Sequence, residues 1–489
     1  MLLPVSLLLA IQGLFPQVNA QQSQQLILEQ TIDASTASLP NPPTYRIPAS
    51  PDPLFITIAL CGSSDNSNQF FVTNDTNISN PGPSDIDFVN TLELAPPDTG
   101  VGTWSQWFTN GGILSVRKGS STVEFQLRVS ASNSSTPDNP LLGDTTSNQA
   151  LIFSPPFDPV QTSPPSFPNY TLPPANLTFP PPPSSPINYT LVFAPTSSTG
   201  ISSIPLTSCA LKNAVASKSA TLLGVAASDG LWLRDSDGWR WQWLVNGLNP
   251  RTNYTLLTYR DGELASSSPT YFLTKSATFS CPIVHSLPFC PTVGYAVPIA
   301  PPRGIAAVHT AATLPSDVTD TLLSVLTNFT TTLSTLACGR DYYSPLVTCA
   351  DCQEAYRRWL CAVSFPRCGE SNTSSASTST STSLASQATA QAALLQPALQ
   401  LVKAGATPRN PILPPFASDY ETLLPCLETC NAADRACPHF LGFKCPLPQF
   451  TAADSYGVGY IDKGEEGVMG GGATGVAQDV YGNVWCNMG

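Results

Sequence analysis

Apolar and polar residues alternate along much of the chain before residue 300, a pattern typical of half-buried β-strands. Leu54 to Leu60 is an apolar run that ends at Cys61, and residues 239–245 carry an apolar residue at every second position. Residues 111–129 hold two alternating runs around Lys118-Gly119-Ser120, which predicts a β-hairpin. We therefore expect two β-sandwich regions, at residues 51–154 and 188–300.

The second region carries a more specific motif. In Gly247 to Tyr259, the Leu248-Asn249-Pro250 turn precedes Tyr254. This segment resembles the corner of fibronectin-type-III-like sandwiches, where a tyrosine hydroxyl bonds back to the turn backbone. The three tryptophans at 239, 241 and 243 share one face of the preceding strand. They could form a sugar-binding platform, but packing in the core is the favoured interpretation.

From Ser316 the apolar spacing changes to steps of three and four, which predicts an amphipathic helix with Ser316 as its N-cap. The stripe consists of Val318, Leu322, Val325, Leu326, Phe329, Leu333 and Leu336. A second helix is predicted from Cys349, with Cys349, Cys352, Tyr356 and Trp359 on one face and Cys361 directed elsewhere. Glu354 and Arg358 are spaced for an ion pair on the opposite face. The fold class predicted overall is α+β and multidomain, with a cysteine-rich helical domain at residues 310–489.

Three segments have the composition of linkers. Residues 21–50 are rich in Gln, Ser and Pro and predict a flexible leader. Residues 155–187 are dominated by proline, contain two glycosylation sequons and end beside a third at Asn188, so they predict an extended, glycosylated spacer. Residues 370–391 are almost entirely Ser, Thr, Ala, Gln and Asn, too few apolar groups to offset ordering entropy, and they predict a disordered insertion.

The start of the chain predicts export through the endoplasmic reticulum. Residues 1–20 contain an apolar run and end in Val18-Asn19-Ala20, as in a cleaved signal peptide. Asn-x-Ser/Thr sequons, which indicate N-glycosylation, occur at Asn74, Asn77, Asn133, Asn169, Asn176, Asn188, Asn253, Asn328 and Asn372.

The even number of cysteines, 14, is consistent with full pairing as disulfides in an exported chain. The residues are Cys61, Cys209, Cys281, Cys290, Cys338, Cys349, Cys352, Cys361, Cys368, Cys426, Cys430, Cys437, Cys445 and Cys486. Because ten of them lie from Cys338 onward, we expect the cross-links to belong to one C-terminal module. Zinc at Cys349-x-x-Cys352 and a thioredoxin-like redox pair are disfavoured alternatives, since no second Cys-x-x-Cys pair and no βαβ pattern occur.

The remaining chemistry is sparse. A net charge of −12 argues against nucleic acid as a partner. Only three histidines occur, and the motifs of common hydrolases and nucleotide-binding enzymes are missing. We predict neither an enzyme nor a cofactor. Asp235-Ser236-Asp237-Gly238 resembles a fragment of a calcium loop but lacks the later ligands, so a β-turn is favoured. After residue 20 no apolar run is long enough to span a membrane.

The cysteine motifs carry a family resemblance. Residues 349–368 read Cys-x-x-Cys…Ala-Tyr-x-x-Trp-Leu-Cys-Ala-Val-x-x-Pro-Arg-Cys, and residues 425–446 and 482–487 add Pro-Cys-x-x-x-Cys…Cys-Pro…Cys-Pro and Gly-Asn-Val-Trp-Cys-Asn. These resemble the signature of the fungal mating-induced-death (MID) family, the glycosylated regulatory component of the stretch-activated, high-affinity calcium channel. The family's cysteine module is similar to frizzled-type domains, which are small helical folds with five disulfides.

The resemblance implies an auxiliary subunit on the extracellular face of the plasma membrane, required for calcium influx. Its partner would be a large, four-repeat, pore-forming subunit, whose own carboxylates select calcium. Contact with the membrane would be mainly through that partner. Our candidate contacts are Tyr342, Tyr343, Arg357, Arg358 and Trp485, while Tyr356 and Trp359 are expected in the core. Two alternatives are a secreted cell-wall or carbohydrate-binding glycoprotein and a secreted frizzled-type ligand-binding module.

Overall fold

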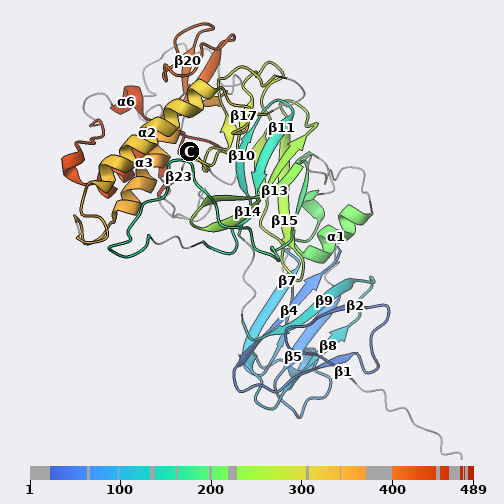
Figure 1. The fold of residues 1–489 in the computed structure, drawn as a ribbon. Helices are drawn as coiled ribbons and strands as arrows, with labels where there is room; N and C mark the ends of the chain where they lie inside the picture. The colour runs from blue at the N-terminus through green and yellow to red at the C-terminus, as the bar shows by residue number, and fades with distance from the viewer. Residues whose placement is uncertain are drawn as a thin grey trace, which may run out of the picture. The chain divides into compact units, whose positions relative to one another are not determined.

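The computed structural model divides into two compact units, residues 1–135 and 136–489, each considered by itself (Figure 1). It describes residues 23–62, 67–96, 99–132, 138–160, 164–197, 201–217, 228–303, 308–341, 343–370, 399–447, 452–461, 474–476, 478 and 483–489. The predicted signal peptide lies outside the described residues, as does the predicted insertion after Glu370.

The first unit is a β-sandwich of two sheets. One sheet has the order β1-β3-β8-β5-β6, and the other has the order β2-β9-β4-β7. The strands are β1 (Gln24–Gln25), β2 (Thr31–Ser35), β3 (Thr44–Ile47), β4 (Pro53–Leu60), β5 (Gln69–Thr73), β6 (Thr91–Glu93), β7 (Val101–Trp107), β8 (Gly112–Arg117) and β9 (Glu124–Ser130). A short 3₁₀ turn, η1 (Pro83–Asp85), precedes β6.

Alternation along the strands builds the core of this unit. Ile56 and Ile58 of β4 meet Val72 of β5 and Leu114 of β8 in one buried cluster, so both sheets turn an apolar face inward. The sandwich prediction therefore fits, but two details were wrong. The two strands of the predicted hairpin, β8 and β9, belong to opposite sheets, because the chain crosses between the sheets at residues 118–123. The predicted flexible leader contributes β1, β2 and β3, and its Leu26, Tyr45 and Ile47 are buried.

The second unit contains another sandwich. Its sheets have the orders β10-β11-β14-β13 and β12-β15-β16. The strands are β10 (Leu141–Thr145), β11 (Gln149–Phe153), β12 (Tyr189–Pro195), β13 (Ser228–Asp235), β14 (Gly238–Asn246), β15 (Asn253–Arg260) and β16 (Thr270–Leu273), with η2 (Ile201–Ser203) and α1 (Ser208–Ala216) between β12 and β13. β10 and β11, expected in the first sandwich, belong here because β11 pairs with β14 along its whole length.

The tyrosine corner is present as predicted. The backbone N–H of Asn249 donates to the Tyr254 hydroxyl at 2.9 Å. Trp239 and Trp243 are buried in the sandwich core, and the partly buried Trp241 donates from its indole to the Ile187 carbonyl at 2.7 Å. These tryptophans are core residues, so they offer no sugar-binding platform. Residues 235–238 form the predicted turn, with Gly238 at φ 134°.

The rest of the second unit is a helical module on small sheets. It begins with β17 (Ile283–Val284) and β18 (Tyr295–Ala296) and continues with α2 (Ser316–Ser334), α3 (Cys349–Ser364), β19 (Arg367–Gly369), β20 (Leu399–Val402), β21 (Tyr420–Leu423), α5 (Leu427–Ala436), η4 (His439–Leu441), α6 (Ala452–Ser455), β22 (Tyr460–Ile461) and β23 (Thr474–Val476). The α2 stripe buries Val318, Leu322 and Leu326 as predicted, but the N-cap is Pro315 and Ser316 is the first helical residue.

This module is not a separate domain. One buried cluster combines Phe289 and Tyr295, next to or on β18, with Leu322 of α2 and Cys361 of α3. Residues expected to be two domains, 188–300 and 310–489, therefore share a core within one compact unit.

Candidate functional site: the disulfide-stapled helix α3

Helix α3 has a well-defined start. Thr348 and Asp351 form a reciprocal capping box, in which the Thr348 hydroxyl accepts from the Asp351 N–H at 3.3 Å and the Asp351 carboxylate accepts from the Thr348 N–H at 2.7 Å. These bonds satisfy amide groups that have no partner inside the helix. The helix ends at Ser364, and Pro366 cannot continue it because proline lacks an N–H.

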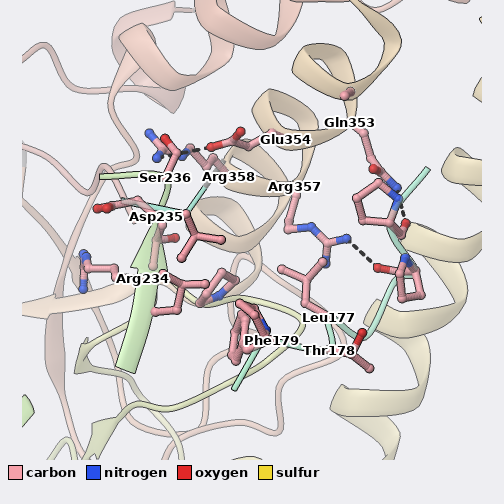
Figure 2. A pocket seen from close by; sticks show the side chains of 18 of the residues that line it. Leu177, Thr178, Phe179, Arg234, Asp235, Ser236, Gln353, Glu354, Arg357 and Arg358 are labelled. Carbon is pink, nitrogen blue, oxygen red and sulfur yellow. Dashed lines mark hydrogen bonds and ion pairs between the residues drawn. The ribbon is translucent and has the colours of Figure 1, made fainter. Parts of the chain in front are cut away.

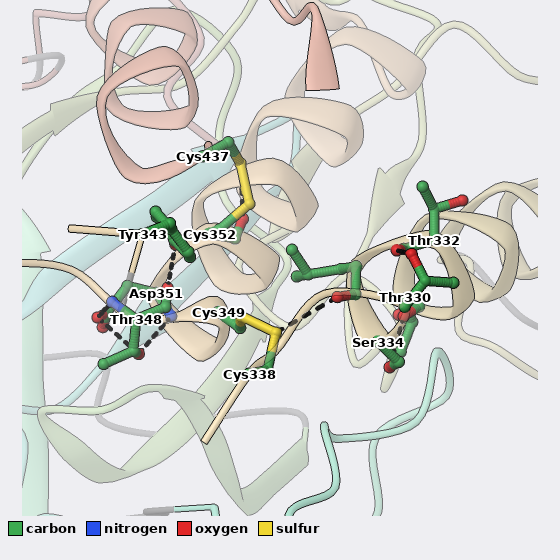
Figure 3. The surroundings of a disulfide bond; sticks show 12 residues. Thr330, Thr332, Ser334, Cys338, Tyr343, Thr348, Cys349, Asp351, Cys352 and Cys437 are labelled. Atoms are coloured by element: carbon green, nitrogen blue, oxygen red, sulfur yellow. Dashed lines mark hydrogen bonds between the residues drawn. A yellow bond between two sulfur atoms is a disulfide. The ribbon is translucent and has the colours of Figure 1, made fainter. Parts of the chain in front are cut away.

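Three disulfides join α3 to three different segments. Cys349 bonds Cys338, which follows α2, and Cys352 bonds Cys437, which follows α5 (Figure 3). Cys361 bonds Cys290 in the loop between β17 and β18. The helix is therefore fixed on more than one side, which agrees with the predicted direction of Cys361 away from Cys349 and Cys352.

The disulfides do not stay within the C-terminal module. Cys281–Cys368 and Cys290–Cys361 join it to the segment after the sandwich, and both cysteines of Cys426–Cys486 and of Cys430–Cys445 lie within it. Cys61 and Cys209 are also disulfide-bonded, and none of the 14 cysteines is free. The expectation that the last ten cysteines pair only among themselves is wrong, because Cys361 and Cys368 reach back to earlier partners. The closed five-disulfide, frizzled-like domain that the resemblance implied is therefore not confirmed.

Metal binding at the cysteines is also contradicted. Cys349 and Cys352, the candidate zinc pair, are in separate disulfides. Within the part of the chain that the structure describes, the one group of His, Cys, Asp and Glu side chains close enough to share an ion is Cys426, Glu428 and Cys486. Its two sulfurs bond each other, so they cannot act as thiolate ligands.

The proline-rich segment lies along α3 as a strap. We use the name strap for residues 164–187. Gln353 donates to the Pro173 carbonyl at 2.7 Å, and Arg357 donates to the Pro174 carbonyl (Figure 2). Arg357 also donates to the carbonyls of Ala175 and Phe289. Proline has no N–H but keeps its carbonyl acceptor, so side-chain donors on a helix can hold such a segment.

Two predictions fail at this contact. The strap is not a spacer between separate domains, because Ala175 and Leu172 pack against the helical module. Arg357 is not an exposed docking residue, since only 5% of it is accessible and its guanidinium is bonded to three carbonyls. Burial lowers the pKa of Arg357 to about 10, which leaves the side chain charged at neutral pH.

The aromatic face of α3 packs inward, as predicted. Tyr356 stacks on Phe329 of α2 with ring centroids 3.7 Å apart, and Trp359 meets Phe443 edge-on at 4.8 Å. The Trp359 indole donates to the Tyr456 hydroxyl at 2.9 Å. Both residues are therefore parts of the core between α3 and its neighbours.

A cavity of about 410 Å³ lies between α3, the strap and the β13–β14 turn (Figure 2). Apolar residues from the strap, including Leu177 and Phe179, form part of its wall. Its charged rim has both signs, with Asp235 on the turn side and an exposed Glu354–Arg358 ion pair at 3.4 Å on the helix. That ion pair is the one predicted from the spacing.

A buried polar cluster fixes the C-terminal end of α3. The Asp144 carboxylate on β10 lies 3.0 Å from Arg367 Nε and 3.0 Å from Lys275 Nζ. The Arg367 guanidinium also lies over the Tyr295 ring at 5.6 Å. The Asn487 amide donates to the carbonyls of Ala362 and Phe365, at 3.1 and 3.2 Å. Arg367 and Asn487 were in the cysteine motifs, but nothing in the sequence marked Asp144.

The other candidate contacts have mixed positions. Tyr342 lies outside the described residues. Tyr343 is half-buried, and its hydroxyl lies 2.6 Å from the Thr348 carbonyl and 2.7 Å from the Ala436 carbonyl. Arg358 and Trp485 are both partly exposed. The most exposed apolar side chains nearby, Leu346 and Phe440, were not predicted, since isolated apolar residues in loops carry no periodic signal.

Leu346 and Phe440 lie in adjoining disulfide-closed loops. Leu346 is 89% exposed inside the Cys338–Cys349 loop, and Phe440 is 66% exposed inside the Cys430–Cys445 loop. The Tyr343–Ala436 contact and the shared packing of Tyr343 and Leu441 bring the two loops together. Exposed Arg435 and Lys444 belong to the same segment. We call Leu346, Phe440, Arg435 and Lys444 the loop surface.

The sequons that can be located lie where a glycan has room. Asn74 is partly exposed, and the others that the structure describes are exposed, at Asn77, Asn169, Asn176, Asn188, Asn253 and Asn328. Asn133 and Asn372 lie outside the described residues. Among the helices that could be assessed, none combines the length and apolar character needed to cross a bilayer.

The fold and the site define a disulfide-rich β protein with a stapled helical module, which suits an extracellular or secreted protein. A family model described as a stretch-activated Ca²⁺-permeable channel component, Mid1, matches residues 54–471. The chain belongs to this family, which confirms the resemblance of its cysteine motifs.

Curated relatives agree with the family. The chain is 37% identical over 371 residues to the stretch-activated cation channel MID1 of Cryptococcus neoformans var. grubii, covering 71% of this chain and 59% of the relative. It is 33% identical over 218 residues to MID1 of Saccharomyces cerevisiae and 28% identical over 225 residues to yam8 of Schizosaccharomyces pombe. These matches cover 41% and 44% of this chain and 34% and 40% of the relatives. The chain thus spans less than two thirds of the length of each.

Solved structures are more distant. A segment of two fibronectin type-III domains from chicken tenascin aligns with 47% of this chain and 95% of its own length, at 12% identity and a TM-score of 0.15. A likeness at that TM-score carries no argument about the arrangement of the whole chain.

Proposed function

We propose that this chain is an extracellular, auxiliary component of a plasma-membrane calcium channel and is required for calcium influx. The observation that carries the proposal is membership of a family described as a channel component. Carboxylates of a separate pore-forming subunit would select calcium. The role of this chain would be to bind that subunit on its extracellular side.

The loop surface is the part of the chain that we propose for docking. Leu346 and Phe440 are exposed, yet each loop is closed by a disulfide and both are held on a stapled helix. Loops fixed in this way lose little conformational entropy on binding. Its exposed cations, Arg435 and Lys444, can pair with carboxylates around the outer mouth of a calcium-selective pore, while the same two loops also carry Asp341 and Asp434.

Co-purification from membranes tests the proposal. The intact chain is expected to recover a large pore-forming protein, and the Leu346→Ser, Phe440→Ser double variant to recover at least tenfold less. Each exposed anchor lost from an interface costs about 1–2 kcal/mol, and 1.4 kcal/mol is tenfold in affinity. Leu273→Ser, which changes an exposed apolar residue on β16, is the matched control.

Calcium uptake gives the functional measurement. In a strain lacking the chain, uptake should be restored by the intact protein and the control but not by the double variant. Undiminished co-purification of the double variant would reject the loop surface as the docking site. Normal calcium uptake in the deletion strain would reject the channel role itself. The carbohydrate-binding alternative has lost its basis, since its tryptophans are in the core.

A further inference from the structure

The first unit carries an exposed apolar cluster that has no role in its own core. Phe88 and Val89 lie in the loop before β6, and Trp107 ends β7. Their exposed fractions are 86%, 63% and 54%. Single exposed apolar residues are ordinary, but a group of large ones commonly marks an interaction site.

Hydrogen bonds hold the loop beside the end of β7. The Gln106 side chain donates to the Val89 carbonyl at 3.0 Å. Asn74 joins both sides, since its N–H donates to the Asn90 carbonyl and its side-chain amide to the Trp107 carbonyl, each at 3.0 Å. These bonds place the Phe88–Val89 loop beside the end of β7, and we call Phe88, Val89 and Trp107 the apolar knob.

The loop is ordered by a single carboxylate. Asp87 accepts from the backbone N–H groups of Val89, Asn90 and Thr91, at 3.0, 2.7 and 2.7 Å. These bonds lower the pKa of Asp87 to about 2, so the carboxylate is charged at every physiological pH. They hold Phe88 at φ 59°, a conformation that is uncommon for a residue with a side chain. An exposed aromatic residue on a preformed loop needs little ordering when it binds.

The charged residues next to the apolar knob along its own segments are acidic. Asp87 lies in its loop, Asp75 follows Asn74, and Asp52 precedes Pro53, which pairs with Trp107. The described part of residues 47–116 contains no lysine, arginine or histidine, and Arg117 lies against Gly82. Such a surface attracts basic partners and is repelled by anionic lipid headgroups. An uncharged bilayer would have to desolvate Asp87 beside the inserted Phe88, which is unfavourable. The charge pattern thus favours a basic protein surface over a membrane.

We propose that Phe88, Val89 and Trp107 form a docking knob that enters an apolar pocket rimmed by lysine or arginine on a partner protein. This inference goes beyond the proposed function, because it concerns the first unit and does not require the partner to be a channel subunit. It also stands apart from the loop surface, which belongs to the second unit.

Site-specific photo-crosslinking in the full chain tests the proposal. A benzophenone amino acid is placed at position 88, the chain is expressed in its own cells, and the crosslinked peptides are mapped by mass spectrometry. We expect crosslinks to a protein segment that contains lysine or arginine next to apolar residues. The same probe at position 27, where Ile27 is 59% exposed in the same unit, is the control and should give at least tenfold less of this product.

Two changes probe the chemistry of the contact. Val89→Ser with Trp107→Ser should lower the crosslinking yield at position 88 at least tenfold without changing the melting temperature, because both side chains are exposed. Neutralising Asp75, Asp85 and Glu93 as Asn, Asn and Gln should lower it several-fold and weaken its dependence on salt. Asp87 is left intact because it orders the loop.

Other products would overturn the inference. Crosslinks to lipid, to a second copy of the chain, or to its own glycans at Asn74 or Asn77 would each replace the proposed partner. A crosslinking yield at position 88 equal to that at position 27 would also reject the inference. So would a vesicle result in which the purified chain sediments with phosphatidylcholine vesicles and the Trp107→Ser variant does not. The expected crosslinks at position 88 can be found even if the loop-surface double variant co-purifies normally with the pore-forming protein. The two proposals can therefore be tested separately.

Discussion

Asp144 is a buried carboxylate held between two cations. It is 4% exposed and lies 3.0 Å from both Arg367 Nε and Lys275 Nζ. It also accepts from the Ala296 N–H at 3.1 Å. These bonds join β10, β18, β19 and the chain after β16, so one side chain connects the sandwich to the helical module.

Replacing Asp144 is predicted to destabilise the second unit in a pH-dependent way. Burial alone raises the pKa of Asp144, but Arg367 and Lys275 override it and lower the pKa to about 2. Because the folded pKa lies below the ordinary value of 3.8, the stabilisation is present above about pH 4 and is lost as the pH falls through 2. Asp144→Asn should cost about 3–5 kcal/mol at pH 7, since two buried cations lose their partner.

Urea unfolding at pH 7, 4 and 2 measures this effect. The difference in the free energy of unfolding between the intact chain and Asp144→Asn should shrink as the pH falls from 4 to 2. Asp341→Asn is the control, because the Asp341 side chain is 65% exposed and pairs with exposed Arg340, and it should change stability by less than about 0.5 kcal/mol. A difference that is the same at all three pH values would contradict the account.

Local chemistry decided which single residues were predictable. Tyr254 was predictable because its bond partner, the Asn249 N–H, is five residues away in the same motif. Arg357 was placed on the surface because arginine is usually exposed. Its acceptors, Pro174 and Ala175, come from a segment about 180 residues earlier, and no local pattern can show that. Asp144 was missed for the same reason.

At the scale of elements, α3 and the strap form one structure. The helix supplies donors from Gln353 and Arg357, and the strap supplies carbonyls that no strand pairs. Helices α2 and α3 were predictable because their apolar spacing is local. The hairpin at 111–129 was wrong because alternation is the same whether two strands pair with each other or belong to opposite sheets. The strap was predicted to be a free spacer because its proline-rich composition does not show which side chains bond to its carbonyls.

Arg357→Met is predicted to loosen the strap. The buried carbonyls of Ala175 and Phe289 and the part-buried carbonyl of Pro174 would lose their donor, which costs about 1–3 kcal/mol for each buried group that stays unsatisfied. Limited proteolysis should then cut near Tyr170 and Leu172 at least several-fold faster than in the intact chain, because the strap opens more often. Arg358→Met is the matched control, since it changes the next residue on the same helix but removes only an exposed ion pair at 3.4 Å. Equal cutting rates in the two variants would show that Arg357 does not hold the strap.

At the scale of the second unit, two disulfides join regions that the sequence presents as separate. Cys281–Cys368 spans 87 residues and ties the segment after the sandwich to β19. Cys290–Cys361 spans 71 residues and ties the same segment to the last turn of α3. Cysteine count and compartment indicated full pairing, but sequence carries no information on which sulfurs meet. The merging of the sandwich and the helical module into one unit was therefore not predictable.

Removing Cys290–Cys361 is predicted to cost about as much as removing Cys430–Cys445, although its cysteines lie 71 residues apart. Cys281–Cys368 stays in place, so Cys290–Cys361 closes a ring of only 9 residues on one side (290 − 281) and 7 on the other (368 − 361). A ring of that size corresponds to about 3 kcal/mol of chain entropy, as does the 15-residue separation of Cys430–Cys445. We expect Cys290→Ser with Cys361→Ser and Cys430→Ser with Cys445→Ser to lower the free energy of unfolding by similar amounts. Hydrogen exchange should also show α3 opening separately from β14 only in the first variant. If both variants exchange alike, the long disulfide does not couple the helical module to the sandwich.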